Sequence, residues 1–293
     1  MILDCRDATA RSEAVAQAAE VVRSGRLLVM PTDTVYGIGA DAFDKVAVAM
    51  VLAAKHRSRD MPPPVLVPSA RTVDGLATDV PLYAKILMRA FWPGALTLVL
   101  RAQGSLAWDL GKTNGTVALR MPQDSLALEV LSEVGPMAVT SANLTGRPAA
   151  TTAHEAQEQL RAAVSLYLDD GPRNEQGAST IVDCTAEEPV VLRHGSLSAD
   201  VLREVLGDTV LHDAPSVPGE DLADHGAHPT DAGETAPSAE EPHPPLPAPR
   251  RPAHGPRLVG SVQASRVATK PGVLKRVGPR EAAPPTPPPT VGE

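Results

Sequence analysis

Aromatic side chains are scarce in this chain of 293 residues: its two Phe, two Trp and three Tyr all precede residue 168. From residue 214 onward there is none, whereas 18 of the 30 prolines lie there. Such a segment buries too little apolar surface to offset the entropy that is lost on ordering. The sequence therefore predicts one folded domain, residues 1–212, and a disordered proline-rich tail, residues 213–293.

Cysteine is also scarce, with Cys5 and Cys184 as the only two. Because their spacing fits no metal site and two cysteines make no disulfide framework, a reducing cytoplasm is the expected environment. No stretch approaches the ~18 apolar residues of a membrane span. The first residues also lack the basic and apolar segments of a secretion signal. We therefore expect a cytoplasmic protein without a membrane anchor.

An excess of positive charge is missing as well, since 27 Lys and Arg against 35 Asp and Glu give a net charge of −8. A protein that coats nucleic acid is usually basic, so this balance leaves room only for a local basic groove. The tail separates its charges into seven acids in residues 220–241 and eight Lys or Arg in residues 250–280. Such segregation can serve as an arm for RNA or an acidic partner, although a solvated extension without a specific role is the simpler interpretation.

The apolar pattern mixes helices and strands. Largely apolar runs such as 27–30, 95–101 and 137–141 predict buried strands, and helical periodicity recurs between them, for example in residues 12–24. Asp44 is a candidate cap for a further helix. Successive strands near 95–121 and 179–193 favour a mixed sheet. The predicted fold class is α/β, with flanking helices that cover a mixed sheet.

Several familiar catalytic motifs are absent. Residues 37–42, Gly-Ile-Gly-Ala-Asp-Ala, loosely match the dinucleotide fingerprint, but Thr-Asp-Thr-Val-Tyr separates these glycines from the preceding strand. No Gly-Lys-Ser/Thr follows, as a P-loop requires, and no G-x-S-x-G elbow occurs. The histidines are scattered, so the sequence predicts no metal site and no nucleophile–base pair.

Hydroxyls and cations gather instead at the ends of predicted strands. Thr32 and Thr34 share one face of an extended segment, where they bind either a polar ligand or their own turn. The run Lys55-His-Arg-Ser-Arg59 ends a helix, so its cations either complement the helix dipole or hold a triphosphate. Arg120 shares a strand face with Thr116 and needs a partner, which is either a protein acid or an anionic ligand.

Small polar residues flank other predicted strands, in residues 140–143, 177–183 and 191–196. By itself each of these stretches is ordinary turn chemistry. Five cations at strand ends accompany them, and together they make a binding constellation for anions. These cations are Lys55, Arg57, Arg59, Arg120 and Arg193.

Seven motifs, in this order, closely resemble those of the YrdC-like threonylcarbamoyl-adenylate synthases: PTDTVYGIGADA, KHRSRDMP, FWPGALTLVL, TVALRMP, SANLTGRPA, GASTIVD and VLRHG. The resemblance covers about residues 10–207 and implies a twisted mixed α/β fold with a concave basic site. It also implies a nucleotidyltransferase that forms threonylcarbamoyl-AMP and pyrophosphate from L-threonine, bicarbonate and ATP, with Mg²⁺ on the phosphates. A separate transferase complex would then use the product to modify the adenosine beside the tRNA anticodon.

The resemblance further implies residue roles. Lys55 and Arg57, the K-x-R of the family, would contact the ATP phosphates and act as the catalytic cations. The nucleotide would also meet Arg59, Thr116, Ser141, Asn143 and Arg193. L-Threonine would meet Thr32 or Thr34, Arg120 through its carboxylate, the backbone of Val139, and Ser179. Tyr36 would shape the pocket, and catalysis would rest on positioning and charge neutralisation rather than on a general base.

The sequence departs from the family pattern in three places. Met61 replaces the usual Asn, Leu66 stands where a His is often found, and His194 replaces the Pro of L-R-P-G. The tail also does not look like the second folded domain of longer members.

Two rival functions stay open at this point. One is a module that binds double-stranded RNA or tRNA without adenylate synthesis, aided by the basic residues of 250–280. The other is a carbamoyl-transfer domain of the hydrogenase-maturation type, although those proteins are longer and carry zinc-finger cysteines.

Overall fold

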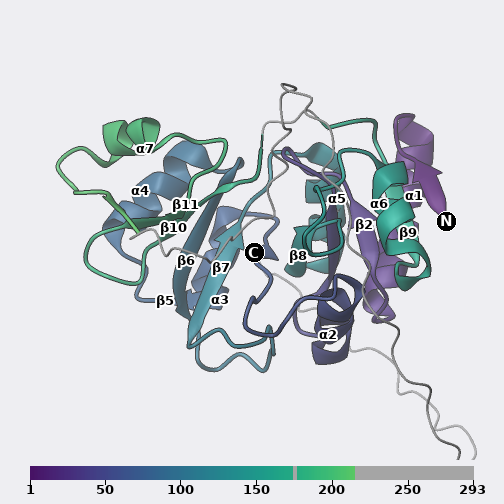
Figure 1. Cartoon of the computed structure of the whole chain (residues 1–293), viewed down its shortest axis with the longest axis horizontal. Helices are drawn as coiled ribbons and strands as arrows, with labels where there is room; N and C mark the ends of the chain where they lie inside the picture. The colour runs from purple at the N-terminus through teal and green to yellow at the C-terminus, as the bar shows by residue number, and fades with distance from the viewer. Residues whose placement is uncertain (174–176, 215–293) are drawn as a thin grey trace, which may run out of the picture. The chain divides into compact units, whose positions relative to one another are not determined.

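The computed structural model describes residues 1–173 and 177–214, which all belong to one compact unit, Met1–Asp231. Its twelve-stranded sheet follows the order β1-β9-β2-β3-β8-β4-β7-β6-β10-β11-β12, and β5 pairs with β6 (Figure 1). The strands are β1 (Ile2–Asp4), β2 (Leu28–Met30), β3 (Gly37–Asp41), β4 (Val65–Leu66), β5 (Ala77–Thr78), β6 (Leu96–Ala102), β7 (Thr116–Arg120), β8 (Met137–Ser141), β9 (Leu166–Asp169), β10 (Thr180–Asp183), β11 (Val190–Arg193) and β12 (His212–Asp213). The tail from residue 215 lies outside the described residues.

This sheet contains both parallel and antiparallel pairs, which confirms the predicted mixed α/β class. For example, β2 pairs parallel with β9 and antiparallel with β3. The helices are α1 (Ala8–Arg23), α2 (Lys45–Ala54), α3 (Val73–Leu76), α4 (Leu82–Phe91), α5 (Ser125–Val134), α6 (Ala153–Leu160) and α7 (Ala199–Leu206). Within the described residues, none of these helices has the length and apolar character needed to cross a membrane.

Polar caps fix where the helices begin. Asp44 accepts hydrogen bonds from the backbone N–H groups of Val46 and Ala47 at the start of α2, as the sequence predicts. Helix α1 begins at Ala8, earlier than residue 12, because Asp7 caps it in the same way. The residues at the start of α1 are mostly polar, so the apolar periodicity did not reveal that the helix begins there.

The residues that resemble a glycine loop form strand β3 instead. Gly37 and Gly39 lie opposite Ser141 and Val139 of β8 in the antiparallel ladder. A Cβ on Gly37 or Gly39 would stand 2.6 Å from a methyl carbon of Val139. The glycines therefore let a bulky side chain of β8 lie across β3, which is a packing role and not a phosphate-binding one.

Helices cover both faces of one half of the sheet. Along β2, Leu28 and Met30 belong to one apolar cluster with α1 and α5, whereas Val29 packs in another with α2 and α6. Successive strand residues point to opposite faces, so these clusters are two layers on opposite sides. Figure 1 shows α1 and α6 beside β2 and β9.

Within the described residues, helices cover only one face of the other half of the sheet. Leu96, Leu98 and Leu100 of β6 pack in a third cluster with α4 and α7, the helices grouped beside β10 and β11 in Figure 1. Their neighbours Thr97 and Val99 point the other way and line a cavity. The run 95–101 predicts a buried strand, and the face that carries Thr97 and Val99 forms the floor of the candidate site.

Candidate active site

A cavity of about 830 Å³ lies over the uncovered face of β7, β6 and β10. Alternate residues of these strands form its floor: Thr116, Ala118 and Arg120 of β7, Thr97 and Val99 of β6, and Ser179 and Ile181 at β10. Because alternate residues of a strand point to the same face, polar and apolar side chains of the three strands line the same surface.

Ten of the twelve predicted site residues line this cavity, although their residue roles stay predictions. They are Thr32, Thr34, Lys55, Arg57, Thr116, Arg120, Val139, Ser141, Ser179 and Arg193. Tyr36 lines it as well, and its hydroxyl donates to the carbonyl of Gly171 at 2.7 Å. The structure therefore brings together segments that lie as far apart in sequence as Thr32 and Arg193.

The lining is rich in positive charge. Among the described residues, four cations, Lys55, Arg57, Arg120 and Arg193, accompany one lining carboxylate, Asp60. The hydrogen bond from Lys112, at 2.6 Å, holds the pKa of the exposed Asp60 below its usual value, so this group is a carboxylate at neutral pH. A cation-lined cavity in a chain of net charge −8 has the electrostatic character that suits an anionic ligand.

The hydrogen-bonding capacity of Thr32 and Thr34 distinguishes the two hydroxyls. Thr32 Oγ1 donates to the carbonyl of Val35 at 2.6 Å and accepts from the backbone N–H of Thr34 at 3.2 Å. Its 3.0 Å contact with Thr34 Oγ1 must then be donated by Thr34, which fills the second lone pair of Thr32. Thr34 accepts from Arg120 and keeps one lone pair open, so Thr34 is the threonine that can accept a hydrogen bond from a ligand.

Arg120 is almost fully buried and already has a protein partner. Its guanidinium donates to Asp33 at 2.7 Å, to Thr34 Oγ1 at 3.1 Å and to the carbonyl of Gly94 at 3.0 Å. Burial lowers the pKa of Arg120 and the Asp33 carboxylate partly offsets this, so the side chain stays charged. Three of its five N–H donors are engaged in these bonds, which leaves donors for a ligand in the cavity.

Lys55, which is 1% exposed, extends from the end of α2 to the end of β8. Its ammonium group donates to the carbonyl of Ser141 at 2.5 Å and to Asn143 Oδ1 at 2.7 Å, and a longer bond reaches Ser141 Oγ. Asn143 is fully buried and is not among the lining residues; it stands behind the ammonium group. Lys55 therefore fixes the Ser141 loop as well as bringing charge to the site.

The two arginines after Lys55 have different surroundings. Arg57 donates to Thr140 Oγ1 at 2.9 Å and lines the cavity. Arg59 instead forms an exposed ion pair with Asp109 at 2.7 Å and is not among the lining residues. The predicted contact of Arg59 with ATP stays a prediction, and the geometry gives it no support.

Sequence reasoning missed Arg173, which lies in an irregular loop after β9. Its guanidinium donates to the carbonyl of Thr32 at 3.0 Å, to Asp124 at 2.8 Å and to Asp170 at 3.0 Å. Asp124 also caps α5. Arg173 thus connects the loop that contains Thr32 to the start of α5. No local sequence pattern predicts this long-range contact.

The family model described as Sua5/YciO/YrdC, telomere recombination, matches residues 20–195. A putative threonylcarbamoyl-AMP synthase of Mycobacterium leprae is 55% identical over 206 residues, which make up 70% of this chain and 94% of that protein. The chain belongs to the Sua5/YciO/YrdC family. This confirms the resemblance that the seven motifs carry.

Solved structures of the Sua5/YciO/YrdC family share the fold. The structure of P. abyssi Sua5 complexed with L-threonine superimposes with a TM-score of 0.68 at 34% identity, over 72% of this chain and 62% of that one. E. coli YciO superimposes with a TM-score of 0.60 at 25% identity, over 67% of this chain and 94% of that one. The mixed sheet with flanking helices is therefore the fold of this family.

Of the three departures from the usual Sua5/YciO/YrdC pattern, two lie at the cavity and one lies beside β12. Met61 and Leu66 both line the cavity; Met61 is 37% exposed at its rim, and Leu66 is buried against the cluster of α1 and α5. His194 is exposed and lies 3.0 Å from Asp213 of β12. The first two departures therefore alter the cavity wall, and the third helps to hold the last described strand.

Proposed function

We propose that this protein is an L-threonylcarbamoyl-AMP synthase, which joins L-threonine, bicarbonate and ATP into threonylcarbamoyl-AMP and releases pyrophosphate. The observation that carries the proposal is the cavity in which four cations and a row of hydroxyls meet in a member of this family. Relatives of that name, at up to 55% identity, support the same activity.

The reaction suits a site without a general base. The amine of L-threonine first attacks the carbon of bicarbonate; a C–O bond of bicarbonate breaks, its oxygen leaves as water with the proton of the amine, and the resulting carbamate carries a second negative charge. A carbamate oxygen then attacks the α-phosphorus of ATP, and the bond to the departing pyrophosphate breaks. Because both reactants are anions, the cations lower the barrier by reducing their repulsion and by holding them in line.

In this proposal each side of the cavity binds one of the two reactants, and the contacts described above support that division. The open lone pair of Thr34 accepts from the nitrogen of L-threonine, and the remaining donors of Arg120 bind its carboxylate. Arg57 and the Lys55–Ser141 network receive the phosphates from the opposite side. The rigidity of these contacts keeps the carbamate oxygen and the α-phosphorus at attacking distance.

Mg²⁺ enters this account as part of the ATP complex. Among the residues that the structure describes, no group of three His, Cys, Asp or Glu could hold a metal ion. Asp60 is the one carboxylate that lines the cavity there, and Mg²⁺ commonly binds through one or two carboxylates together with substrate phosphates. When bound, the ion neutralises charge on the pyrophosphate that leaves.

The sulfur chemistry of the chain gives no support to a carbamoyl-transfer rival. Cys5 and Cys184 are both buried, and burial raises their pKa values to about 11 and about 12, respectively. Protonated thiols in apolar surroundings are neither metal ligands nor nucleophiles at neutral pH. An RNA-binding module without synthesis is likewise not favoured, because the curated relatives carry the name of an enzyme.

The direct test incubates the protein with ATP, L-threonine, Mg²⁺ and [14C]bicarbonate. We expect a labelled adenylate that forms only when all three substrates are present. Failure of label to appear in an adenylate, with folding verified, would reject the function. In the same experiment, a transferase complex and tRNA should convert the product into modified tRNA, and salt-dependent tRNA binding without any adenylate would favour the RNA-binding rival.

A further inference from the structure

Thr97 lies beside the residues expected to bind the L-threonine carboxylate, yet the motif resemblance gives it no role. Thr97 and Arg120 are the next residues outward from the Leu98–Leu119 pair of the β6–β7 ladder. Both side chains point away from the apolar cluster and into the cavity. On its other side, Thr97 stands next to Ser179, with 2.9 Å between the two hydroxyl oxygens.

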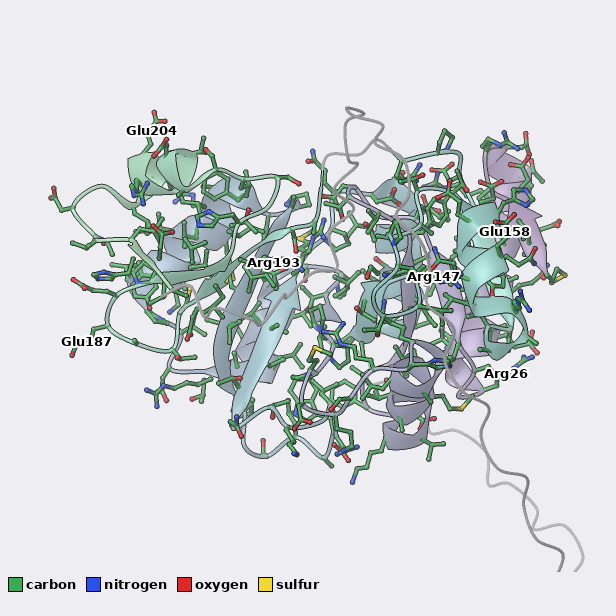
Figure 2. The ribbon with its side chains drawn as sticks, viewed as in Figure 1. Arg26, Arg147, Glu158, Glu187, Arg193 and Glu204 are labelled. Atoms are coloured by element: carbon green, nitrogen blue, oxygen red, sulfur yellow. The ribbon has the colours of Figure 1, made fainter. Side chains whose placement is uncertain are left out.

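These residues form one row across the cavity floor. Ser179 Oγ accepts from Arg193 at 3.1 Å, and Arg193, labelled in Figure 2, also donates to the Ser179 carbonyl at 2.7 Å. Arg120 at the opposite end of the row donates to Thr34. Two arginines therefore flank a pair of hydroxyls, and the row ends at Thr34, whose Oγ1 can accept a hydrogen bond from a ligand.

The hydroxyl pair has one proton to spare. Thr97 and Ser179 carry one hydroxyl proton each, and their mutual hydrogen bond uses one of the two. Within residues 1–173 and 177–214, the other proton has no acceptor. Both residues are buried, with exposures of 1% and 6%, so a donor without a partner here is costly unless a ligand atom accepts from it.

The acceptor that fits is an oxyanion. An arginine on each side of the hydroxyl pair would repel a cationic ligand group. The spare hydroxyl proton needs an acceptor, so the ligand group beside it cannot be another hydrogen-bond donor. An α-amino acid matches the whole row, because its nitrogen can reach the open lone pair of Thr34 while its carboxylate lies between Arg120 and the hydroxyl pair. One carboxylate oxygen then pairs with Arg120 and the other accepts the spare proton.

We propose that Thr97, acting as a pair with Ser179, supplies a hydrogen bond to the carboxylate of the bound L-threonine. The inference rests on the proposed function for the identity of the amino acid, and it adds a substrate-contacting residue to that site. It predicts that Thr97 determines affinity for the carboxylate and contributes little to ATP binding.

The test compares Thr97→Val, which keeps the shape and removes the hydroxyl, with Thr97→Ser, which restores it. In Thr97→Val we expect the Kd for L-threonine, measured by calorimetry, to rise roughly tenfold, the usual loss for one hydrogen bond to a charged group. The KM for ATP should stay within about twofold, and Thr97→Ser should bind L-threonine nearly as the native protein does. 1-Amino-2-propanol, which corresponds to L-threonine without its carboxylate, should bind the native protein and Thr97→Val equally.

Thr180→Val is the matched control, because Thr180 is buried next door but faces the other way. Its hydroxyl donates to the carbonyl of Leu197 at 2.7 Å and accepts from the Leu197 N–H at 3.1 Å. We expect this variant to lose thermal stability and to keep its affinity for L-threonine.

Two results would overturn the inference: a Kd for L-threonine within about twofold of the native value in Thr97→Val, or an equal loss of affinity for L-threonine and 1-amino-2-propanol. Failure of the proposed function is a separate outcome, because it appears in the native protein as a lack of labelled adenylate. The binding comparison of the two ligands does not depend on that assay.

Discussion

Arg57 and Arg59 lie two residues apart, yet the structure separates their roles. Arg57 lines the cavity and bonds to Thr140, whereas Arg59 is paired with Asp109 on the exterior. From the sequence alone, both are equivalent cations after a helix. Which side chain enters the site depends on the direction that each takes in an irregular loop, and no local pattern encodes that direction.

The contrast between these arginines gives a matched pair of variants. Arg57→Ala should raise the KM for ATP by roughly 10–100-fold, because a charge-assisted contact of about 1.5–3 kcal/mol is lost. Arg59→Ala should leave it within about twofold, since exposed ion pairs contribute little. Steady-state pyrophosphate release at varied ATP measures both, and equal effects of the two substitutions would contradict the assignment.

At the scale of elements, the pairing of β3 with β8 depends on residues that lack a side chain. Gly37 lets the Val139 side chain lie across β3. A Cβ added at Gly37 would stand only 2.6 Å from a methyl carbon of Val139. Gly37→Ala should lower the free energy of unfolding by about 1–3 kcal/mol through overpacking. In a Val139→Ala background the same change should cost clearly less. Urea unfolding of the four proteins checks this, and additive losses would refute the packing account.

The clamp at Arg173 joins two elements, the loop after β2 and the start of α5. Arg173→Met would leave the buried carboxylate of Asp124 and the partly exposed one of Asp170 without this cation, so we expect a loss of about 3–5 kcal/mol in unfolding free energy. Adding Asp124→Asn should recover part of that loss, because it removes one of the stranded charges. If the double variant is no more stable than Arg173→Met, the ion pair does not hold these elements together.

Much of the sheet was predictable because its strands are apolar runs bounded by turn residues. β6 and β8 follow from such runs, and the Asp44 cap follows from its position before an apolar helix. β3 was not predictable, since two glycines in five residues disfavour a strand unless a neighbour fills the space. The candidate site was reached mainly through ordered motifs, whereas the contacts of Thr97 and Arg173 arise from strands and loops that meet only in the folded chain.

At the scale of the whole molecule, the acidic chain concentrates cations in one cavity, and each of its lining residues within the described part of the chain precedes residue 194. The division into a catalytic domain, 1–212, and a tail stays a prediction. A variant that ends at residue 214 should release pyrophosphate with a kcat/KM within about twofold of the full chain, because the tail is expected to supply no contact that strengthens in the transition state. A loss of more than about tenfold would place part of the active site beyond residue 214.

The central claim is that one cavity holds an amino acid and ATP together, and the most direct measurement is pyrophosphate release as a function of L-threonine. With ATP, Mg²⁺ and bicarbonate present, release should depend on L-threonine and saturate with its concentration. In the presence of L-threonine, it should be abolished when bicarbonate is withheld. Arg120→Met should abolish the L-threonine-dependent release of pyrophosphate, because that substitution removes the proposed partner of the L-threonine carboxylate. Pyrophosphate release that is independent of L-threonine, or absent altogether in the folded native protein, would contradict the account.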